Sequence, residues 1–440
     1  MSISVSIGEG EGARLRSHHL RAAVLGELHA RPFTAIETPR RVLHFAFDTT
    51  GERGAADRAA LFAFCAGRGL VMPRAADKHH RVTFGTTALR WEQHSEFTTY
   101  TWELPAEATA EAARPFHPPA TTLAALMGLV PPPGPVLVAL DLHLVAGQGI
   151  APERLFDRAS LAVAENSDST ALYATDFQCD PTGFVRMLVI DRGLGAERAG
   201  ALVQRLLELE TYRTLALLAL PEAQRLAPSI ANIERRLAEI TEDMRGTSGL
   251  AGNRAHLDEL TELAAELEAG AAASLFRFGA SRAYNEIVRL RLETIGERKV
   301  DGLPTWTSFL ARRMQPAMRT CVTTEERQTG LSSKLERTAQ LLRTRVEVAL
   351  QQQNQDLLKS MNERTRLQLR LQATVEGLSV AAITYYVVGL IHYLAEGVAA
   401  AGVHIEPGII TAAVVPVVAL VIWSVVRRVR RRHTDSAPPA

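Results

Sequence analysis

The chain has 440 residues, of which 47% are hydrophobic and 22% charged, and its formal net charge is +1. This length allows two or three structural units with a sizeable apolar core. The near-neutral charge argues against a partner that is recognised by a strong field, such as nucleic acid. Three widely spaced cysteines, Cys65, Cys179 and Cys321, indicate neither a disulfide framework nor a thiolate zinc site. Residues 1–23 lack the basic-then-apolar pattern of a signal peptide, so we expect the bulk of the chain in the cytoplasm.

Residues 1–193 are predicted to form a cytoplasmic α/β domain. Runs with alternating β-branched and aromatic residues predict strands, and clusters of Gly and Pro separate them. Helical stretches near 54–67 and 121–129 fall between these strands. The expected strands are 41–47, 81–91, 96–104, 135–145, 171–178 and 183–193.

Residues 194–373 are predicted to form a helical stalk region, because Ala, Leu, Glu, Arg and Gln dominate there. Proline lacks the N–H that a helix interior needs, so the first helix should stop or kink at Pro221. Two further breaks are expected, at 246–253 and at 299–305.

The last helix of this region is expected to run into the membrane segment without interruption. Its apolar residues Leu335, Val346 and Leu357 are eleven positions apart, which predicts a nearly straight coiled-coil helix with slight right-handed supercoiling. One apolar stripe on so polar a helix needs a partner. That partner is either the preceding helices or another subunit.

Residues 374–440 are predicted to form a two-span transmembrane hairpin with a basic tail. The segments 377–395 and 408–426 each have the length and apolar character that a bilayer crossing requires. Basic residues flank both spans on one side, whereas the connecting loop carries only Glu396, His404 and Glu406. By the positive-inside rule, both termini are cytoplasmic and the protein is multi-pass in the inner membrane.

The basic tail has two interpretations. It either stops transfer and touches anionic lipid headgroups, or forms a positive ring around a cytoplasmic pore mouth. The residues concerned are Arg427, Arg428, Arg430, Arg431 and Arg432.

The first span carries small and polar residues on one face, which a simple anchor would not need. Ser379, Tyr386, Gly389 and Tyr393 share this face because they recur at helical spacing. Such a face either packs against another helix or lines a polar path, because hydroxyl groups that face lipid lack hydrogen-bond partners.

Two other groups of residues are candidate sites. Glu27, His29 and Arg31 would need partners elsewhere for catalysis, and a structural ion pair explains them as well. On a strand, Glu92, His94 and Glu96 would share one face and could hold a divalent metal, although a solvated strand face is the plainer interpretation. No phosphate loop, nucleophile elbow or zinc-protease motif is present.

Three stretches together resemble one bacterial family, domain-of-unknown-function family 3422, whose members are described as membrane-anchored. They are GELHARPF, LRWEQHSEFTTYTW and EGLSVAAITYYVVGL. The resemblance implies an α/β domain, helices and a membrane anchor, and it implies no catalytic residue.

The layout is also similar to that of CorA-type divalent-cation channels, which are homopentamers whose first spans line the pore. Their Gly-Met-Asn signature is absent, and His392, Tyr393 and Leu394 fall about where it would lie. By this likeness we expect a homo-oligomer in the lipid bilayer, either a cation channel or a derivative that has lost the selectivity filter.

In the channel interpretation His392, Glu396 and Glu406 would lie near the outer mouth, where carboxylates attract cations. The alternative is a membrane-anchored cytoplasmic binding or scaffolding module without transport. We expect no cofactor other than a divalent cation, no nucleic-acid partner and no enzymatic activity, and a tethered enzyme that uses Glu27, His29 and Arg31 is the remaining hypothesis.

Overall fold

The structure is a computed structural model, and it describes residues 17–21, 24–25, 33–74, 77–106, 116, 120–147, 150–246, 249–401 and 406–434. For 120–123 and 429–434 the backbone alone is described. The chain divides into two compact units, Met1–Glu239 with Thr261–Glu336, and Ile240–Leu260 with Arg337–Ala440.

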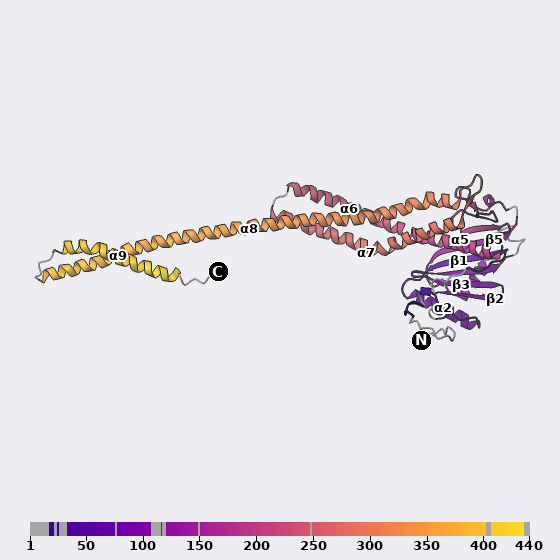
Figure 1. The fold of residues 1–440 in the computed structure, drawn as a ribbon, viewed down its shortest axis with the longest axis horizontal. Coiled ribbons are helices and arrows are strands. Elements are labelled where there is room, and N and C mark those ends of the chain that lie inside the picture. The colour runs from indigo at the N-terminus through magenta and orange to yellow at the C-terminus, as the bar shows by residue number, and fades with distance from the viewer. Residues whose placement is uncertain are drawn as a thin grey trace, which may run out of the picture. The chain divides into compact units, whose positions relative to one another are not determined.

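The first unit is built on one sheet (Figure 1). Within the described residues its strand order is β2-β3-β4-β1-β5-β8-β7-β6-β9. All pairings are antiparallel except that of β5 with β8, which is parallel. The strands are β1 (Arg40–Asp48), β2 (His79–Phe84), β3 (Thr87–Gln93), β4 (Phe97–Pro105), β5 (Val136–Ala146), β6 (Ala162–Glu165), β7 (Ala171–Thr175), β8 (Val185–Asp191) and β9 (Arg298–Lys299).

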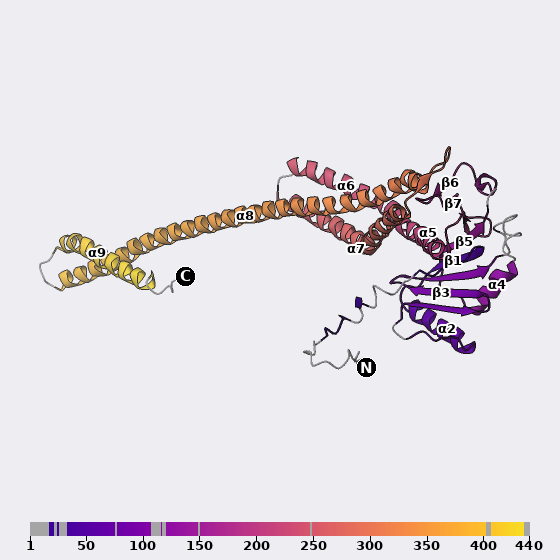
Figure 2. The same ribbon diagram turned by 45° about the vertical axis from the view of Figure 1, so that its right-hand side comes forward.

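Helices cover both faces of the sheet, and Figure 2 shows α2 and α5 on opposite sides. On β1, Val42 and Ala46 pack with α5, whereas Leu43 and Phe45 pack with α2 and α4. Because both faces of β1 are buried, residues 42–47 are apolar except for His44. The helices are α2 (Arg53–Gly67), α4 (Ala120–Leu129), the short 3-10 helix η1 (Pro152–Arg154), α5 (Ala196–Leu217), α6 (Ala219–Gly246), α7 (Leu250–Ile295), α8 (Trp306–Ala400) and α9 (Pro407–Thr434).

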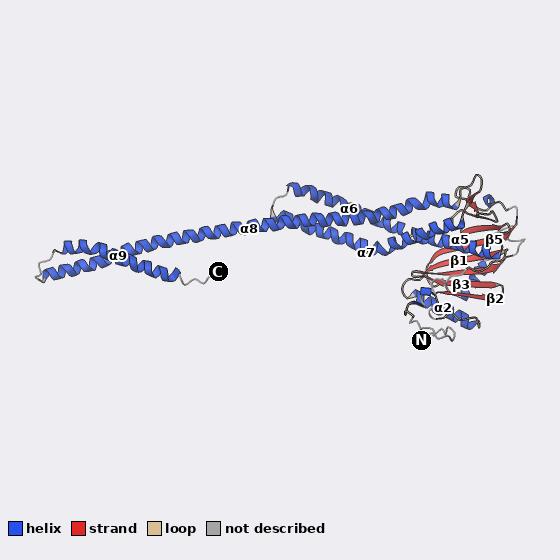
Figure 3. Cartoon of the chain, in the orientation of Figure 1, coloured by secondary structure: helices blue, strands red, loops and turns tan. Residues whose placement is uncertain are grey.

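The predicted order of a sheet domain followed by long helices is confirmed (Figure 3). Two details of the strands differ from the prediction. The segment 81–91 is not one strand but parts of β2 and β3, which turn at Gly85 with φ +57°. The short strand β6 was not predicted, although it pairs with the neighbouring strand β7. The two-residue strand β9 was not predicted because its partner β6 is far away along the chain.

The predicted helix break is present, but it lies four residues before Pro221 rather than at it. Helix α5 ends earlier, at Leu217, and Pro221 lies in the first turn of α6. The first backbone N–H groups of a helix have no partner within that helix, so a proline costs little there.

Within the first unit, α6, α7 and α8 are joined by polar contacts along their lengths. Arg327 of α8 forms an ion pair with Glu234 of α6 at 2.7 Å, and Ser332 of α8 donates to Glu268 of α7 at 2.7 Å. The side chains of Leu331 and Leu335 are buried on the same part of α8.

The second unit contains most of α8 together with α9. Leu342 is fully buried, and Arg345 donates to the backbone oxygen of Met244 at 2.6 Å. From Gln351 to Val375, every residue of α8 is exposed. Beyond this segment, α8 and α9 each contain a stretch that is long and apolar enough to cross a membrane, by length and composition.

Candidate functional site

The hairpin of α8 and α9 holds most of the residues that the sequence singles out. Ala395 is buried and Thr384 half-buried where α8 packs on α9, and a groove of about 960 Å³ lies between the two helices. Tyr386 and Tyr393 each lie two residues from one of these positions, and two residues turn a helix by about 200°. Both tyrosines are 71% exposed. They line the outer edge of the groove and point away from the side of α8 that packs on α9.

The other two residues of the predicted face are small. Ser379 is exposed, and its hydroxyl donates to the backbone oxygen of Val375 at 2.8 Å. Gly389 is half-buried, and a Cβ atom added there would meet nothing within 4 Å. The small and hydroxyl-bearing residues of this face are therefore not covered by another described segment.

His392 lies outside this face and connects the two helices of the hairpin. Its Nδ1 is 2.8 Å from the hydroxyl of Thr411 on α9, and its Nε2 is 3.5 Å from Glu396. Glu406 is exposed next to the first residue of α9, and His404 lies outside the described residues.

Of the basic tail, the structure describes the side chains of Arg427 and Arg428, which are both exposed. The guanidinium of Arg427 lies 4.8 Å from the ring centre of Trp423. The side chains of Arg430, Arg431 and Arg432 are outside the described part, as are Glu27, His29 and Arg31.

A second site lies in the α/β domain, and we call it the polar pocket. It has a volume of about 240 Å³ and lies between one face of the sheet and helix α5. Its lining side chains come from β1, β3, β4, the turn after β3, α5 and α7: His44, Arg90, Glu92, His94, Phe97, Thr99, Gln204, Leu207, Glu208, Thr211, Tyr212 and Arg291.

The alternation of β3 places two opposite charges in this pocket. Leu89 and Trp91 point into the core that contains α2, so Arg90 and Glu92 point to the other face, towards α5. Arg90 is 6% exposed and Glu92 8% exposed. Arg90 Nη1 donates to Gln204 at 3.2 Å, and Glu92 accepts from Thr99 at 3.4 Å.

His44 forms the floor of the polar pocket and is uncharged at neutral pH. Its Nδ1 lies 2.8 Å from the hydroxyl of Thr101, and its Nε2 lies 2.9 Å from the hydroxyl of Thr211. Burial, and after it the positive charges of Arg90 and His94, lower the pKa of His44 to about 3.

The expected shared face of Glu92, His94 and Glu96 is wrong in both its forms. β3 ends at Gln93, so His94 lies in a turn, where its ring stacks on Phe97 at 4.1 Å. Glu96 is buried and binds Arg277 and Tyr284 of α7 at 2.7 and 2.5 Å. The three residues are thus neither a metal site nor a solvated strand face, and the described residues contain no group of three or more His, Cys, Asp and Glu that could hold a metal.

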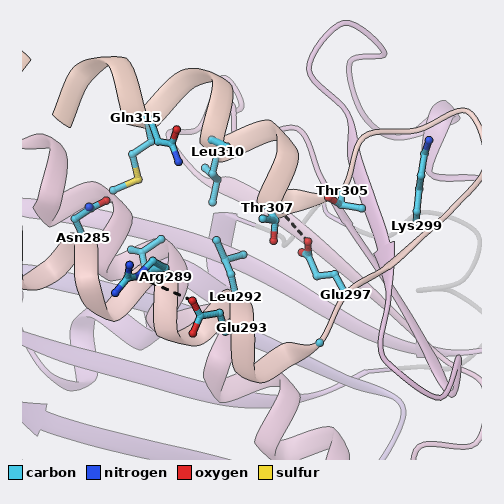
Figure 4. Close-up of a pocket in the computed structure, with 14 residues that line it drawn as sticks. Asn285, Arg289, Leu292, Glu293, Glu297, Lys299, Thr305, Thr307, Leu310 and Gln315 are labelled. Atoms are coloured by element: carbon cyan, nitrogen blue, oxygen red, sulfur yellow. Dashed lines mark hydrogen bonds and ion pairs between the residues drawn. The ribbon is translucent and has the colours of Figure 1, made fainter. Parts of the chain in front are cut away.

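A third cavity, of about 520 Å³, lies where α7 ends and α8 begins (Figure 4). Leu292 and Leu310 line its apolar part. Glu297 accepts the backbone N–H of Thr307 at 2.9 Å, and burial raises the pKa of this carboxyl. The cavity thus has an apolar wall and, beside it, the half-buried carboxyl group of Glu297.

Sequence reasoning missed the polar pocket as a site. Its helical residues, such as Gln204, Glu208 and Arg291, come from α5 and α7, which are distant from β3 along the chain. The available signal was the alternation of Arg90 and Glu92 with large apolar residues within one strand. Polar residues at alternate strand positions are more often solvated, so burial could not be deduced without the helices.

Comparison with known proteins identifies the family. Neither the curated proteins nor the solved structures contain a match to the chain, so the likeness to CorA-type channels gains no support from them. The sequence model of the family described as protein of unknown function (DUF3422) matches residues 16–433. The chain therefore belongs to the DUF3422 family.

Proposed function

We propose that this protein is a homo-oligomeric inner-membrane protein of CorA-like layout, in which copies of α8 associate along one face. The hairpin of α8 and α9 crosses the lipid bilayer, and both termini are cytoplasmic because basic residues flank both spans. The proposal includes neither enzymatic activity nor nucleic-acid binding.

The observation that carries the proposal is one face of α8, mostly apolar but interrupted by Arg364 and Gln368, which we call the α8 face. Its members follow one another at steps of four, seven or fourteen residues, which are close to whole helical turns. It starts at Val346 and Leu350, which are half-buried, and continues through the exposed segment 351–375 into the first span. It consists of Val346, Leu350, Leu357, Met361, Val375, Ser379, Tyr386 and Tyr393.

Exposure of apolar side chains to water is unfavourable, so a long helix with exposed apolar residues gains free energy of stabilisation when a partner covers them. Leu357 is 61% exposed and Met361 58% exposed. The helices α6 and α7 meet α8 near Leu342 and Arg345, and no described segment covers residues 351–375. This burial pattern favours a second copy of α8 over the preceding helices as the partner of this segment.

The experiment compares two double variants of the full-length protein purified in mild detergent. Leu357→Glu with Met361→Glu places charges on the α8 face, so we expect the particle to fall to monomers. Leu358→Glu with Leu369→Glu is the matched control, because both leucines are similarly exposed, at 64% and 60%, but lie about 90° and about 110° from the centre of that face around the helix. Particle mass is measured by light scattering.

Two outcomes of this experiment would contradict the proposal. A wild-type protein that is monomeric in mild detergent, or a control variant that dissociates as readily as the α8-face variant, would contradict the proposal. A pentamer is the state that the CorA-like layout predicts.

Cation passage along the axis is the second candidate function. It is favoured by the position of Tyr386 and Tyr393, which continue the α8 face into the span, and by Glu396 and Glu406 near the loop of the hairpin. At a symmetry axis the tyrosine rings would narrow the path, and the carboxylates would raise the local cation concentration at its outer end.

Flux of Mg²⁺ into liposomes tests this second candidate. We expect Tyr386→Ala with Tyr393→Ala to increase the flux, whereas Tyr385→Ala, at an exposed tyrosine about 80° to 100° from these two positions around the helix, should leave it unchanged. If assembled wild-type and variant proteins both pass no ion, the protein is an oligomeric anchor for a cytoplasmic binding or scaffolding module.

A further inference from the structure

We propose that the polar pocket of the α/β domain binds a small zwitterion of the amino-acid type, with its carboxylate on Arg90 and its ammonium group on Glu92. The proposal does not depend on oligomerisation or transport, because every residue of the pocket belongs to the first compact unit.

Two charged atoms in this pocket lack partners. Arg90 Nε and Glu92 Oε1 are buried and form no hydrogen bond in the described structure. Both side chains are more than nine-tenths buried. A buried charged group without its full set of hydrogen bonds costs free energy, so such a pair requires a reason.

Two other charged side chains of the pocket neutralise each other. Arg291 binds Glu208 at 2.5 Å, and Glu208 also accepts from the amide of Gln204 at 3.0 Å. The same Gln204 accepts from Arg90 Nη1 at 3.2 Å. His44 is uncharged. Arg90 Nε is therefore an unpaired hydrogen-bond donor on a positive group, and Glu92 Oε1 is an unpaired acceptor on a negative group.

Their spacing suits a ligand with separated charges. The two residues are two positions apart on one strand face, so their Cα atoms are about 7 Å apart. No ion pair joins the two side chains among the described residues, and both of them line the pocket. A molecule with one anionic and one cationic group would satisfy both at once, whereas a simple anion or cation would leave one unpaired.

The volume and the position of the pocket limit the ligand further. At about 30 Å³ per water, 240 Å³ is the space of about eight waters, which is below the usual size of a drug-like ligand site. Arg291 and Glu208 are partly exposed and form the side of the pocket that opens to solvent. A ligand of amino-acid size can therefore enter and reach the strand.

The test uses the full-length protein in detergent and glycine together with the standard L-amino acids as probes. Thermal unfolding and titration calorimetry measure binding. We expect at least one amino acid to bind and to raise the melting temperature. Its N-acetyl and carboxamide derivatives, which each lack one charge, should bind at least about tenfold more weakly, a difference of about 1.4 kcal/mol.

Variants of the two strand residues give the second readout. Arg90→Met and Glu92→Gln should each weaken binding of that amino acid at least about tenfold, while Glu103→Gln, which removes a buried carboxylate of β4 outside the pocket, should bind normally. Without ligand, both pocket variants should melt no lower than the wild type, because each removes an unsatisfied charge.

Three outcomes would overturn the proposal. One is that no amino acid binds, which would mean that the pocket holds water only. Another is that the derivatives lacking one charge bind as tightly as the parent amino acid. The third is that the variants without ligand are strongly destabilised while their binding is intact, which would make Arg90 and Glu92 structural.

Discussion

The imidazole of His44 is held neutral by its surroundings at the centre of the α/β domain. Both of its ring nitrogens contact threonine hydroxyls, one on β4 and one on α5. A proton added to this ring would be buried beside Arg90. The neutral ring therefore links sheet and helix, and its protonation would bury a charge.

This protonation cost predicts an acid-sensitive fold. Unfolded histidine has a pKa near 6.5, and the pKa of folded His44 is about 3. Between these values only the unfolded chain takes up the proton, so stability falls as the pH drops below 6.5, by about 1.4 kcal/mol per pH unit. At neutral pH this loss is absent.

The substitution His44→Gln tests this prediction, because it keeps hydrogen-bonding capacity but cannot titrate. We expect the variant to show a flatter decline of unfolding free energy between pH 7.5 and pH 5 than the wild type. Tryptophan fluorescence in denaturant measures it, and His19→Gln, at an exposed position, is the control. Equal slopes for wild type and His44→Gln would refute the assignment.

Among the elements, α5 is the one whose position depends on the closest backbone contact. A Cβ atom at Gly200 would lie 1.8 Å from the backbone oxygen of Thr34. Glycine is needed here because two backbone segments touch, although its helical conformation suits any residue. The first turn of α5 thereby lies directly on the strand-like segment before β1, where Ile36 donates to the backbone oxygen of Ala196 at 2.9 Å.

Two alanine substitutions in helices should therefore have opposite effects. Gly200→Ala must displace backbone, so we expect a loss of about 1–3 kcal/mol. Gly330→Ala in α8, where nothing lies within 4 Å of the added atom, should gain about 0.5–1 kcal/mol through helix propensity. Thermal unfolding of both variants measures the difference, and a Gly200→Ala protein as stable as the wild type would contradict the close contact.

The sequence predicted the positions of most helices and strands, but not which strands pair with one another. Segments 135–145 and 183–193 correspond to β5 and β8, because runs of β-branched residues carry their own strand signal. Their parallel pairing was not predictable, since it depends on which distant strand lies alongside. The helix junction near Pro221 was misplaced because proline is tolerated in the first turn of a helix.

At the scale of the whole molecule, the proposed topology leaves all described residues of the α/β domain on the cytoplasmic side. The charges on both flanks of the hairpin have the same sign, and a hairpin with basic flanks places both flanks inside. The sheet domain and the C-terminal tail are therefore expected in the same compartment.

Reporter fusions test this topology. Alkaline phosphatase fused after Ala440 should be inactive, whereas the same reporter inserted between α8 and α9 should be active, because that enzyme functions only in the periplasm. Carbonate washing of vesicles is the second measurement, and the protein should stay in the membrane fraction. An active reporter after Ala440, or release by carbonate, would refute the two-span arrangement.

The sequence by itself determined the class and order of the parts: the α/β domain, the long helices and the two apolar helices of the C-terminal hairpin. These features depend on the periodicity and composition of neighbouring residues, which are visible in the sequence itself. The tertiary structure alone decided the polar pocket and the contacts of Glu96, whose partner Arg277 is 181 residues away. It also decided where α8 leaves α6 and α7. Such contacts depend on which segments meet in space, and no local pattern specifies that meeting.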